Sequence, residues 1–185
     1  MCMDSGAENP GRRRFMTRSA WAIAGLLGSA FQVHGERPRP RRLGLHNLHT
    51  GETLDVTYWE NGDYVPDALT AIDHLLRDHR SNEAHPIDTR LLDTLSRLGQ
   101  RLDFNRRYEV ISGYRSPATN EMLRRQGREV ALRSMHMEGK AIDMRAPGLD
   151  LRRVRTKARD LEAGGVGYYT RSGFIHLDVG PVRTW

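Results

Sequence analysis

The order of short strand-like segments and amphipathic helical segments is the feature that most restricts the fold of this chain. Apolar residues spaced three or four positions apart predict four helices, which begin near residues 66, 88, 116 and 150. Short runs rich in β-branched and aromatic residues predict six strands, at 43–48, 53–59, 108–112, 141–144, 166–169 and 174–179. The resulting order, β-β-α-α-β-α-β-α-β-β, predicts an α+β fold with a small, mostly antiparallel sheet and flanking helices.

Residues with defined roles at helix ends support these segments. Asp88, Ser116 and Asp150 precede three of the helical stretches, where their side chains are expected to act as N-caps. The pair Gly164-Gly165 is expected to stop the fourth helix. Trp185 follows the last predicted strand and is expected to fill an edge of the core.

The first part of the chain reads as an export signal. An arginine run precedes the apolar stretch 20–33, which is shorter than the roughly twenty residues that span a bilayer. Arg12-Arg13, followed by Phe15 and Met16, resembles the twin-arginine signal. We therefore predict a twin-arginine export signal at 1–35, with an uncleaved anchor as the alternative. A Pro/Arg-rich tether would follow at 36–42, and the folded domain would occupy 43–185.

Composition narrows the chemistry of the folded domain. Cys2 is the only cysteine and lies in the predicted signal, so the domain has neither a disulfide nor a cysteine ligand. Any metal site must therefore use histidines and carboxylates. The net charge of +6 suits an anionic partner, but part of it belongs to the signal, and 7% aromatic residues is little for stacking bases. We expect no nucleic-acid partner.

Three polar residues stand among small or apolar neighbours where strands or their entries are predicted: His136, Asp143 and His176. Two imidazoles and one carboxylate supply three protein ligands and leave a fourth position for water, as in catalytic zinc sites. Gly139 permits a tight turn after which a short strand would bring Asp143 back beside His136. Residues two apart on a strand share a face, so Asp178 is expected to enter the same site.

Two motifs in this region resemble those of a known superfamily. The segment Ser134–Asp143, Ser-Met-His-Met-Glu-Gly-Lys-Ala-Ile-Asp, is similar to the Ser-x-His-x-x-Gly-x-Ala-x-Asp motif of the zinc D-alanyl-D-alanine peptidases. These peptidases are relatives of lysostaphin and of the hedgehog signalling domain. Ser112–Ser116 is similar to the superfamily's Ser-x-Tyr-Arg-Ser segment, and His176 fits its late ligand. Over about 43–185 the chain resembles the exported murein endopeptidases of this superfamily.

The resemblance implies a zinc peptidase that hydrolyses cross-linked stem peptides of bacterial peptidoglycan in the periplasm. It implies one Zn²⁺ ion per domain, held by the two histidines and the aspartate described above. It also supports Arg115 as the group that stabilises the oxyanion or binds a substrate carboxylate, because a guanidinium suits both. Ser134 and Tyr114 are candidates for contacts with the ligands or the substrate.

The general base is the point at which this chain departs from the superfamily. Relatives place a glutamate three residues before the third ligand or a histidine two residues from it, whereas this chain has Gly173 and Asp178. In one assignment His176 binds zinc, and Asp178 activates the water or orients His176. In the other, Asp178 binds zinc and His176 is the base. We favour the first, because an acidic base is familiar beside a His/Asp/His zinc shell.

Two other functions fit the same residues. A D-alanyl-D-alanine carboxypeptidase would trim stem peptides instead of cutting bridges. A noncatalytic zinc module would bind wall peptides; the departure at Gly173 favours it, and the intact Arg115 segment counts against it. For each, we expect a monomer with peptidoglycan stem peptides as partner and no stable membrane insertion once the signal is removed. The cross-link cleaved is either D-alanine to diaminopimelate or diaminopimelate to diaminopimelate.

Overall fold

The computed structural model describes residues 39–127 and 130–185. The predicted export signal, 1–35, and the first residues of the predicted tether, 36–38, lie outside the described residues. Strand β1 (Arg41–Asn47) includes the last two residues of the predicted tether, so the sheet begins two residues before the predicted domain start at 43. No helix in the described ranges is long and apolar enough to cross a bilayer.

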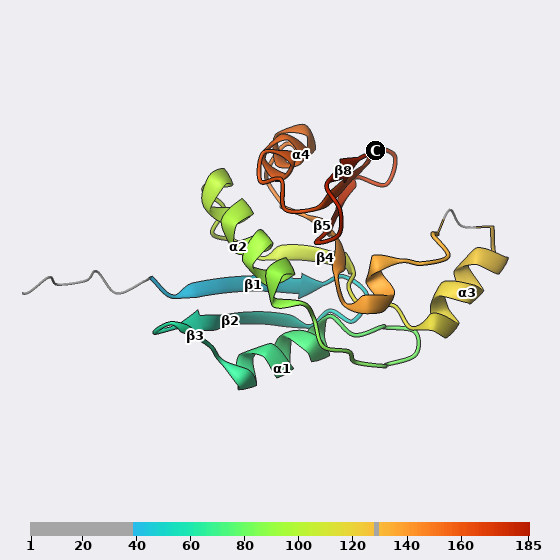
Figure 1. The fold of residues 1–185 in the computed structure, drawn as a ribbon, viewed down its shortest axis with the longest axis horizontal. Helices are drawn as coiled ribbons and strands as arrows, with labels where there is room; N and C mark the ends of the chain where they lie inside the picture. Colours follow the sequence, from blue (N-terminus) through green and yellow to red (C-terminus); the bar gives the residue numbers. More distant parts are fainter. Residues whose placement is uncertain (1–38, 128–129) are drawn as a thin grey trace, which may run out of the picture. The chain divides into compact units, whose positions relative to one another are not determined.

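The described residues form an α+β fold built on one mixed sheet (Figure 1). Its order is β3-β2-β1-β4-β5-β7-β6-β8, and two of its pairs, β1–β4 and β6–β8, are parallel. The α+β class is confirmed, but the described sheet has eight strands and is larger than predicted. The other strands are β2 (Thr53–Glu60), β3 (Asp63–Tyr64), β4 (Tyr108–Ser112), β5 (Ala141–Arg145), β6 (Gly165–Tyr169), β7 (Phe174–Asp178) and β8 (Arg183–Thr184). The helices are α1 (Pro66–Leu75), α2 (Thr89–Leu102), α3 (Pro117–Arg125), α4 (Leu151–Arg159) and the 3-10 turn η1 (Met135–Glu138).

The strands β4, β5, β7 and β6 align one row of residues across the sheet. Ser112 pairs with Asp143, Asp143 with His176, and His176 with Gly167. Directly paired residues point to the same face of a sheet, so this row brings two of the predicted ligands side by side.

The opposite face of these strands belongs to the core. Side chains that alternate with Asp143 and His176 are at most 2% exposed; they are Ile142, Met144, Ile175 and Leu177. Helix α4 packs against β6 and β7, while α2 contacts β1 and α4 (Figure 1). The leucines predicted to face the core from α2 are all buried: Leu91, Leu92, Leu95, Leu98 and Leu102.

The predicted N-caps are confirmed, whereas one predicted helix end is wrong. The side chains of Asp88, Ser116 and Asp150 each accept a hydrogen bond from a backbone N–H of the first helical turn. Helix α4, however, ends at Arg159, well before the Gly164-Gly165 pair. Turn hydrogen bonds take over after Arg159, and the second glycine opens β6 instead.

A buried aspartate ties the segment after α1 to the start of α3. Asp78 is 2% exposed, and its carboxylate accepts hydrogen bonds from the backbone N–H and hydroxyl of Ser116 and the backbone N–H of Arg80. Burial alone would raise the pKa of Asp78, but the hydrogen bonds, including one from Thr119, lower it to about 2. Asp78 thus fixes the backbone next to Arg115.

We predict that Asp78→Asn lowers the free energy of unfolding at pH 7 by about 1–3 kcal/mol, because an amide nitrogen then faces buried N–H donors. Since the pKa of Asp78 is lowered in the folded state, its contribution is present above the ordinary pKa of 3.8 and is lost as the pH falls through about 2. Urea unfolding of the parent and of the Asp78→Asn variant between pH 2 and 7 measures the difference in stability. Asp63→Asn, at an exposed position, is the control. Equal stability of the two variants at pH 7 would contradict the prediction.

Candidate metal centre

Three ligand-type side chains converge where η1 meets β5 and β7. His136 Nε2 lies 3.3 Å from Asp143 Oδ1 and 3.2 Å from His176 Nδ1. His176 Nδ1 lies 2.9 Å from Asp143 Oδ1. The structure therefore brings together the three residues that the sequence singled out, in a group that could hold a metal ion.

The spacing of these atoms fits a tetrahedral metal site. A zinc ion with bonds of about 2.0–2.1 Å to nitrogen and oxygen holds its ligand atoms about 3.3 Å apart. The three atoms of this group already lie at 2.9–3.3 Å from one another. Three protein ligands leave one tetrahedral position open, which is the arrangement of catalytic sites.

Each imidazole is oriented by the nitrogen that faces away from the group. His136 Nδ1 donates to the carbonyl oxygen of Gly113 at 2.7 Å, and His176 Nε2 donates to Asp178 Oδ2 at 3.0 Å. Carbonyl and carboxylate oxygens only accept, so these contacts leave His136 Nε2 and His176 Nδ1 unprotonated in the neutral rings. Outer partners of this kind fix the ring orientation of metal-binding histidines.

The local fold of His136 depends on a glycine. His136 lies in η1, a 3-10 turn, and not at the strand entry that was expected. Gly139 ends this turn with a φ of 65°, in the left-handed region, as predicted for a turn that disfavours other residues. A Cβ atom at Gly139 would lie 2.3 Å from the carbonyl oxygen of Pro86. The turn therefore closes against the loop before α2, and β5 follows directly with Asp143.

The charges of the group suit a cation. Burial would raise the pKa of Asp143, but His136 and His176 outweigh it and hold that pKa well below its usual range. Burial would lower the pKa of His176, yet hydrogen bonds with Asp143 and Asp178 raise it overall. Asp143 is therefore ionised at neutral pH, which is the form that binds metals.

Arg115 lies beside the group with few fixed partners. Its side chain is 11% exposed, and one terminal nitrogen lies 3.9 Å from Asp143 Oδ2. Its hydrogen bonds to Ser112 Oγ and Asn120 Oδ1 are long, at 3.4 and 3.5 Å, and its Nε has no partner in the described residues. Burial lowers the pKa of this guanidinium, although the negative charge of Asp143 acts in the opposite direction. A largely buried cation thus faces the group with hydrogen-bonding capacity to spare.

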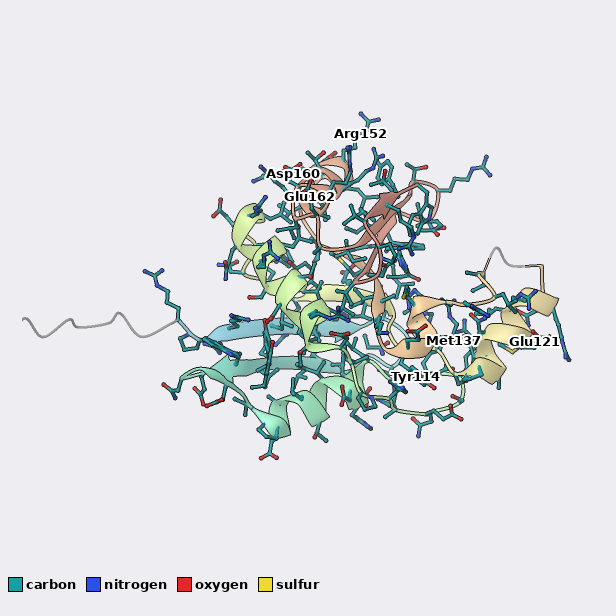
Figure 2. All side chains as sticks on the ribbon, in the orientation of Figure 1. Tyr114, Glu121, Met137, Arg152, Asp160 and Glu162 are labelled. Atoms are coloured by element: carbon teal, nitrogen blue, oxygen red, sulfur yellow. The ribbon has the colours of Figure 1, made fainter. Side chains whose placement is uncertain are left out.

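The two residues predicted to contact ligands or substrate occupy different surroundings. Ser134 is 7% exposed and directly precedes η1, where its side chain caps no backbone N–H. Tyr114 is 8% exposed and stacks on His85, with ring centroids 4.8 Å apart. Figure 2 labels Tyr114 and also Met137, which lies in η1. The structure thus packs the ring of Tyr114 against the loop before α2.

Asp178 lies behind His176 and not among the three converging atoms. Its side chain is fully buried, at 0% exposure. Its Oδ1 accepts from the backbone N–H groups of Gly165 and Gly180, at 3.0 and 2.9 Å, and its Oδ2 accepts from Arg183 at 2.7 Å and from His176. Burial would raise the pKa of Asp178, but the hydrogen bonds from His176, Gly180 and Gly165 hold it well below its usual range. The carboxylate is therefore ionised and occupied by N–H donors.

Arg183 and Trp185 reach the site although no sequence argument placed them there. Trp185 does not fill a core edge as predicted, because it is 47% exposed and its ring centroid lies 5.3 Å from that of His176. Strand β8 was missed because two residues are too few to show alternation. The sequence carries no signal that pairs this strand with β6, because the register joins Gly165 to Arg183 and Val166 to Thr184, far apart in the chain.

Comparison with known proteins identifies the family. Residues 36–185 match the family model described as peptidoglycan L,D-endopeptidase MepK. The chain belongs to this family. It is 44% identical over 175 residues to the peptidoglycan L,D-endopeptidase MepK of Escherichia coli (strain K12), covering 94% of this chain and 96% of that protein. It is 46% identical over 176 residues to the probable peptidoglycan L,D-endopeptidase MepK of Haemophilus influenzae, covering 94% and 95%. No solved structure matches the chain significantly.

We predict that Gly139→Ala destabilises the protein more than twice as much as Gly51→Ala. Both glycines have positive φ, at 65° and 73°, so both variants incur about 1–2 kcal/mol of backbone strain. A Cβ at Gly51 meets nothing within 4 Å, whereas one at Gly139 meets the Pro86 carbonyl. Urea unfolding of the two variants and the parent measures the difference. Equal losses would mean that the Pro86 loop yields freely and does not fix the His136 turn.

Proposed function

We propose that this chain is a zinc-dependent peptidoglycan L,D-endopeptidase. Its membership of the MepK family, over residues 36–185, supports the reaction and the substrate class. The convergence of His136 Nε2, Asp143 Oδ1 and His176 Nδ1 within bonding range of one ion is the observation that carries the metal dependence.

We propose that these three atoms hold one zinc ion, which leaves the fourth position for water or substrate. Zinc there would polarise the scissile carbonyl and lower the pKa of a water molecule. The donor set of two imidazoles and one carboxylate suits zinc, and the outer contacts to Gly113 and Asp178 fix both rings.

We propose that Arg115 binds the oxygen on which negative charge develops, or a carboxylate of the substrate. Support comes from its place beside Asp143, its burial, and its weak internal hydrogen bonds. A preorganised cation in a partly desolvated position stabilises developing charge without first losing strong partners.

For Asp178 we propose the orienting role among those left open by the sequence. Activation of water requires an accessible carboxylate oxygen, but the side chain is fully buried and receives N–H donors on both oxygens. The contact of Oδ2 with His176 Nε2 instead supports a role in keeping Nδ1 turned toward the other two ligands. Arg183 would in turn fix this carboxylate.

The name of the relatives favours one of the two cross-links considered. In a bridge between two diaminopimelates, the carbonyl comes from an L centre and the nitrogen from a D centre. In a bridge from D-alanine, both centres are D. We therefore propose that the bond between two diaminopimelates is the one hydrolysed, because the relatives are described as L,D-endopeptidases.

We propose that the chain acts in the periplasm as a monomer after export by its first 35 residues. The paired arginines and the short apolar stretch support the twin-arginine route. The tether beginning at Glu36 would then precede the sheet, which starts at Arg41.

The purified chain loaded with zinc should convert cross-linked muropeptides of isolated peptidoglycan into uncross-linked ones, which are analysed after the glycan strands have been digested with a muramidase. Mass spectrometry of the products, with a chelated sample and a zinc-restored sample, identifies the bond and the metal requirement. Release of single D-alanine residues would instead indicate a carboxypeptidase. Zinc-loaded protein that binds peptidoglycan and leaves its cross-links intact would support the binding module and refute our proposal.

We predict that His136→Ala lowers bound zinc from about one ion per chain to near zero and abolishes hydrolysis. The fold should survive, because His136 lies on a short turn and not in the leucine-rich core. Elemental analysis and circular dichroism are the measurements, and His74→Ala, at an exposed helix position, is the control. Full zinc content in the His136 variant would refute the ligand assignment.

We predict that Arg115→Ala lowers kcat/KM by about 100-fold to 1,000-fold while zinc content stays unchanged, as for the loss of one oxyanion donor. Arg125→Ala removes an exposed arginine from α3 and should leave the rate unchanged. Steady-state kinetics on a purified muropeptide dimer measures both. A rate within threefold of the parent would exclude Arg115 from charge stabilisation.

A further inference from the structure

The face of β6 that lies beside His176 lacks side chains at two positions. Gly165 and Gly167 are two residues apart in β6 and so lie on the same face, and Gly167 pairs directly with His176. A Cβ at Gly165 would lie 2.4 Å from Asp178 Oδ2 and 2.9 Å from Arg183. A Cβ at Gly167 would lie 2.8 Å from the ring of Trp185. The two glycines therefore leave space for the side chains of Arg183, in β8, and of Trp185, which directly follows β8.

Trp185 is fixed in this place from several directions. Its backbone N–H donates to the carbonyl of Val166 at 3.3 Å, and its carbonyl accepts from Tyr168 N–H at 2.9 Å. Its indole Nε1 donates to the hydroxyl of Tyr169 at 3.0 Å. The guanidinium of Arg183 lies 5.0 Å from its ring centroid. A ring held in this way loses little conformational freedom when a ligand binds to it.

Trp185 nevertheless remains open to solvent and begins a row of aromatic rings next to the ligand group. It is 47% exposed, and Tyr169 is 37% exposed. Tyr169 in turn stacks on Phe174 with ring centroids 4.6 Å apart. We call Trp185, Tyr169 and Phe174 the aromatic row. Its first ring lies 5.3 Å from His176, so a substrate bound at the ligand group would reach it.

We propose that the aromatic row is a substrate subsite whose main contact, Trp185, binds the methylene chain of a diaminopimelate residue next to the scissile bond. This inference rests on the proposed function, which supplies the substrate class. The apolar groups of stem peptides are few: the alanine methyl groups, the two methylenes of D-glutamate and the three methylenes of diaminopimelate, which form the longest of these segments. A rigid, flat, half-exposed indole buries such CH groups, while the charged ends of the diaminopimelate stay in water.

The subsite predicts a preference that can be measured without catalysis. We would titrate the zinc-loaded protein by calorimetry with L-Ala-γ-D-Glu-meso-diaminopimelate and with the same tripeptide carrying alanine in the third position. The parent should bind the first peptide about tenfold more tightly. Trp185→Ala should abolish this preference, and Trp185→Phe, which keeps a flat ring, should retain most of it.

Two further variants separate the subsite from a merely structural role. Val182→Ala, which shortens an exposed apolar side chain close to β8, should leave the preference intact. Gly167→Ala keeps the tryptophan but forces its ring to move, so it should weaken the preference. Thermal unfolding and zinc content of each variant show whether the fold and the ligand group are intact.

Kinetics on the diaminopimelate-bridged dimer completes the test. Trp185→Ala should raise KM about tenfold and leave kcat within about threefold. An unchanged peptide preference in Trp185→Ala would overturn the subsite, as would equal weakening of both peptides. If the parent protein hydrolyses no dimer and yet shows the peptide preference, the proposed function fails while the binding subsite stands.

Discussion

The contact between Asp143 and His176 across β5 and β7 is the interaction on which the rest of this structure depends. An ionised carboxylate in the middle of a sheet costs several kcal/mol unless charge or hydrogen bonds compensate it. Here Arg115 lies 3.9 Å from the second oxygen of Asp143, and the two imidazoles beside the first oxygen complete a group that could hold a metal cation. The elements around this pair serve to deliver those three partners: η1 carries His136, β7 carries His176, and the segment after β4 carries Arg115.

The same principle extends outward from His176. Its far nitrogen meets Asp178, which is buried more completely than Asp143 and is compensated by two backbone N–H groups and Arg183. A carboxylate thus lies on each side of the His176 ring, and Arg183 lies beyond Asp178. Each buried group in this series has a partner of opposite sign or a hydrogen-bond donor, so the arrangement remains stable although it lies in the interior of the protein.

Much of this arrangement could be predicted from local sequence. The turn at Gly139, the strand with Asp143, and the N-caps at Ser116 and Asp150 each depend on neighbours a few residues away, so their signals are short and readable. Helix α4 ends at Arg159, earlier than predicted, because turn hydrogen bonds follow that residue and the helix does not continue to Gly164. The position of Trp185 could not be predicted, because it depends on a backbone hydrogen bond to Val166 and on the space left by Gly167, both distant in the chain.

Alternation along β5 and β7 links the site to the core. On one face lie Asp143 and His176, and on the other lie Ile142, Met144, Ile175 and Leu177. A slip of one residue in either strand would turn polar ligands into the core and apolar side chains into the site at once. The ligand group and the leucine-rich interior therefore assemble in a single register. The fraction of molecules in a preparation that display an assembled ligand group is for this reason also the fraction that has folded natively.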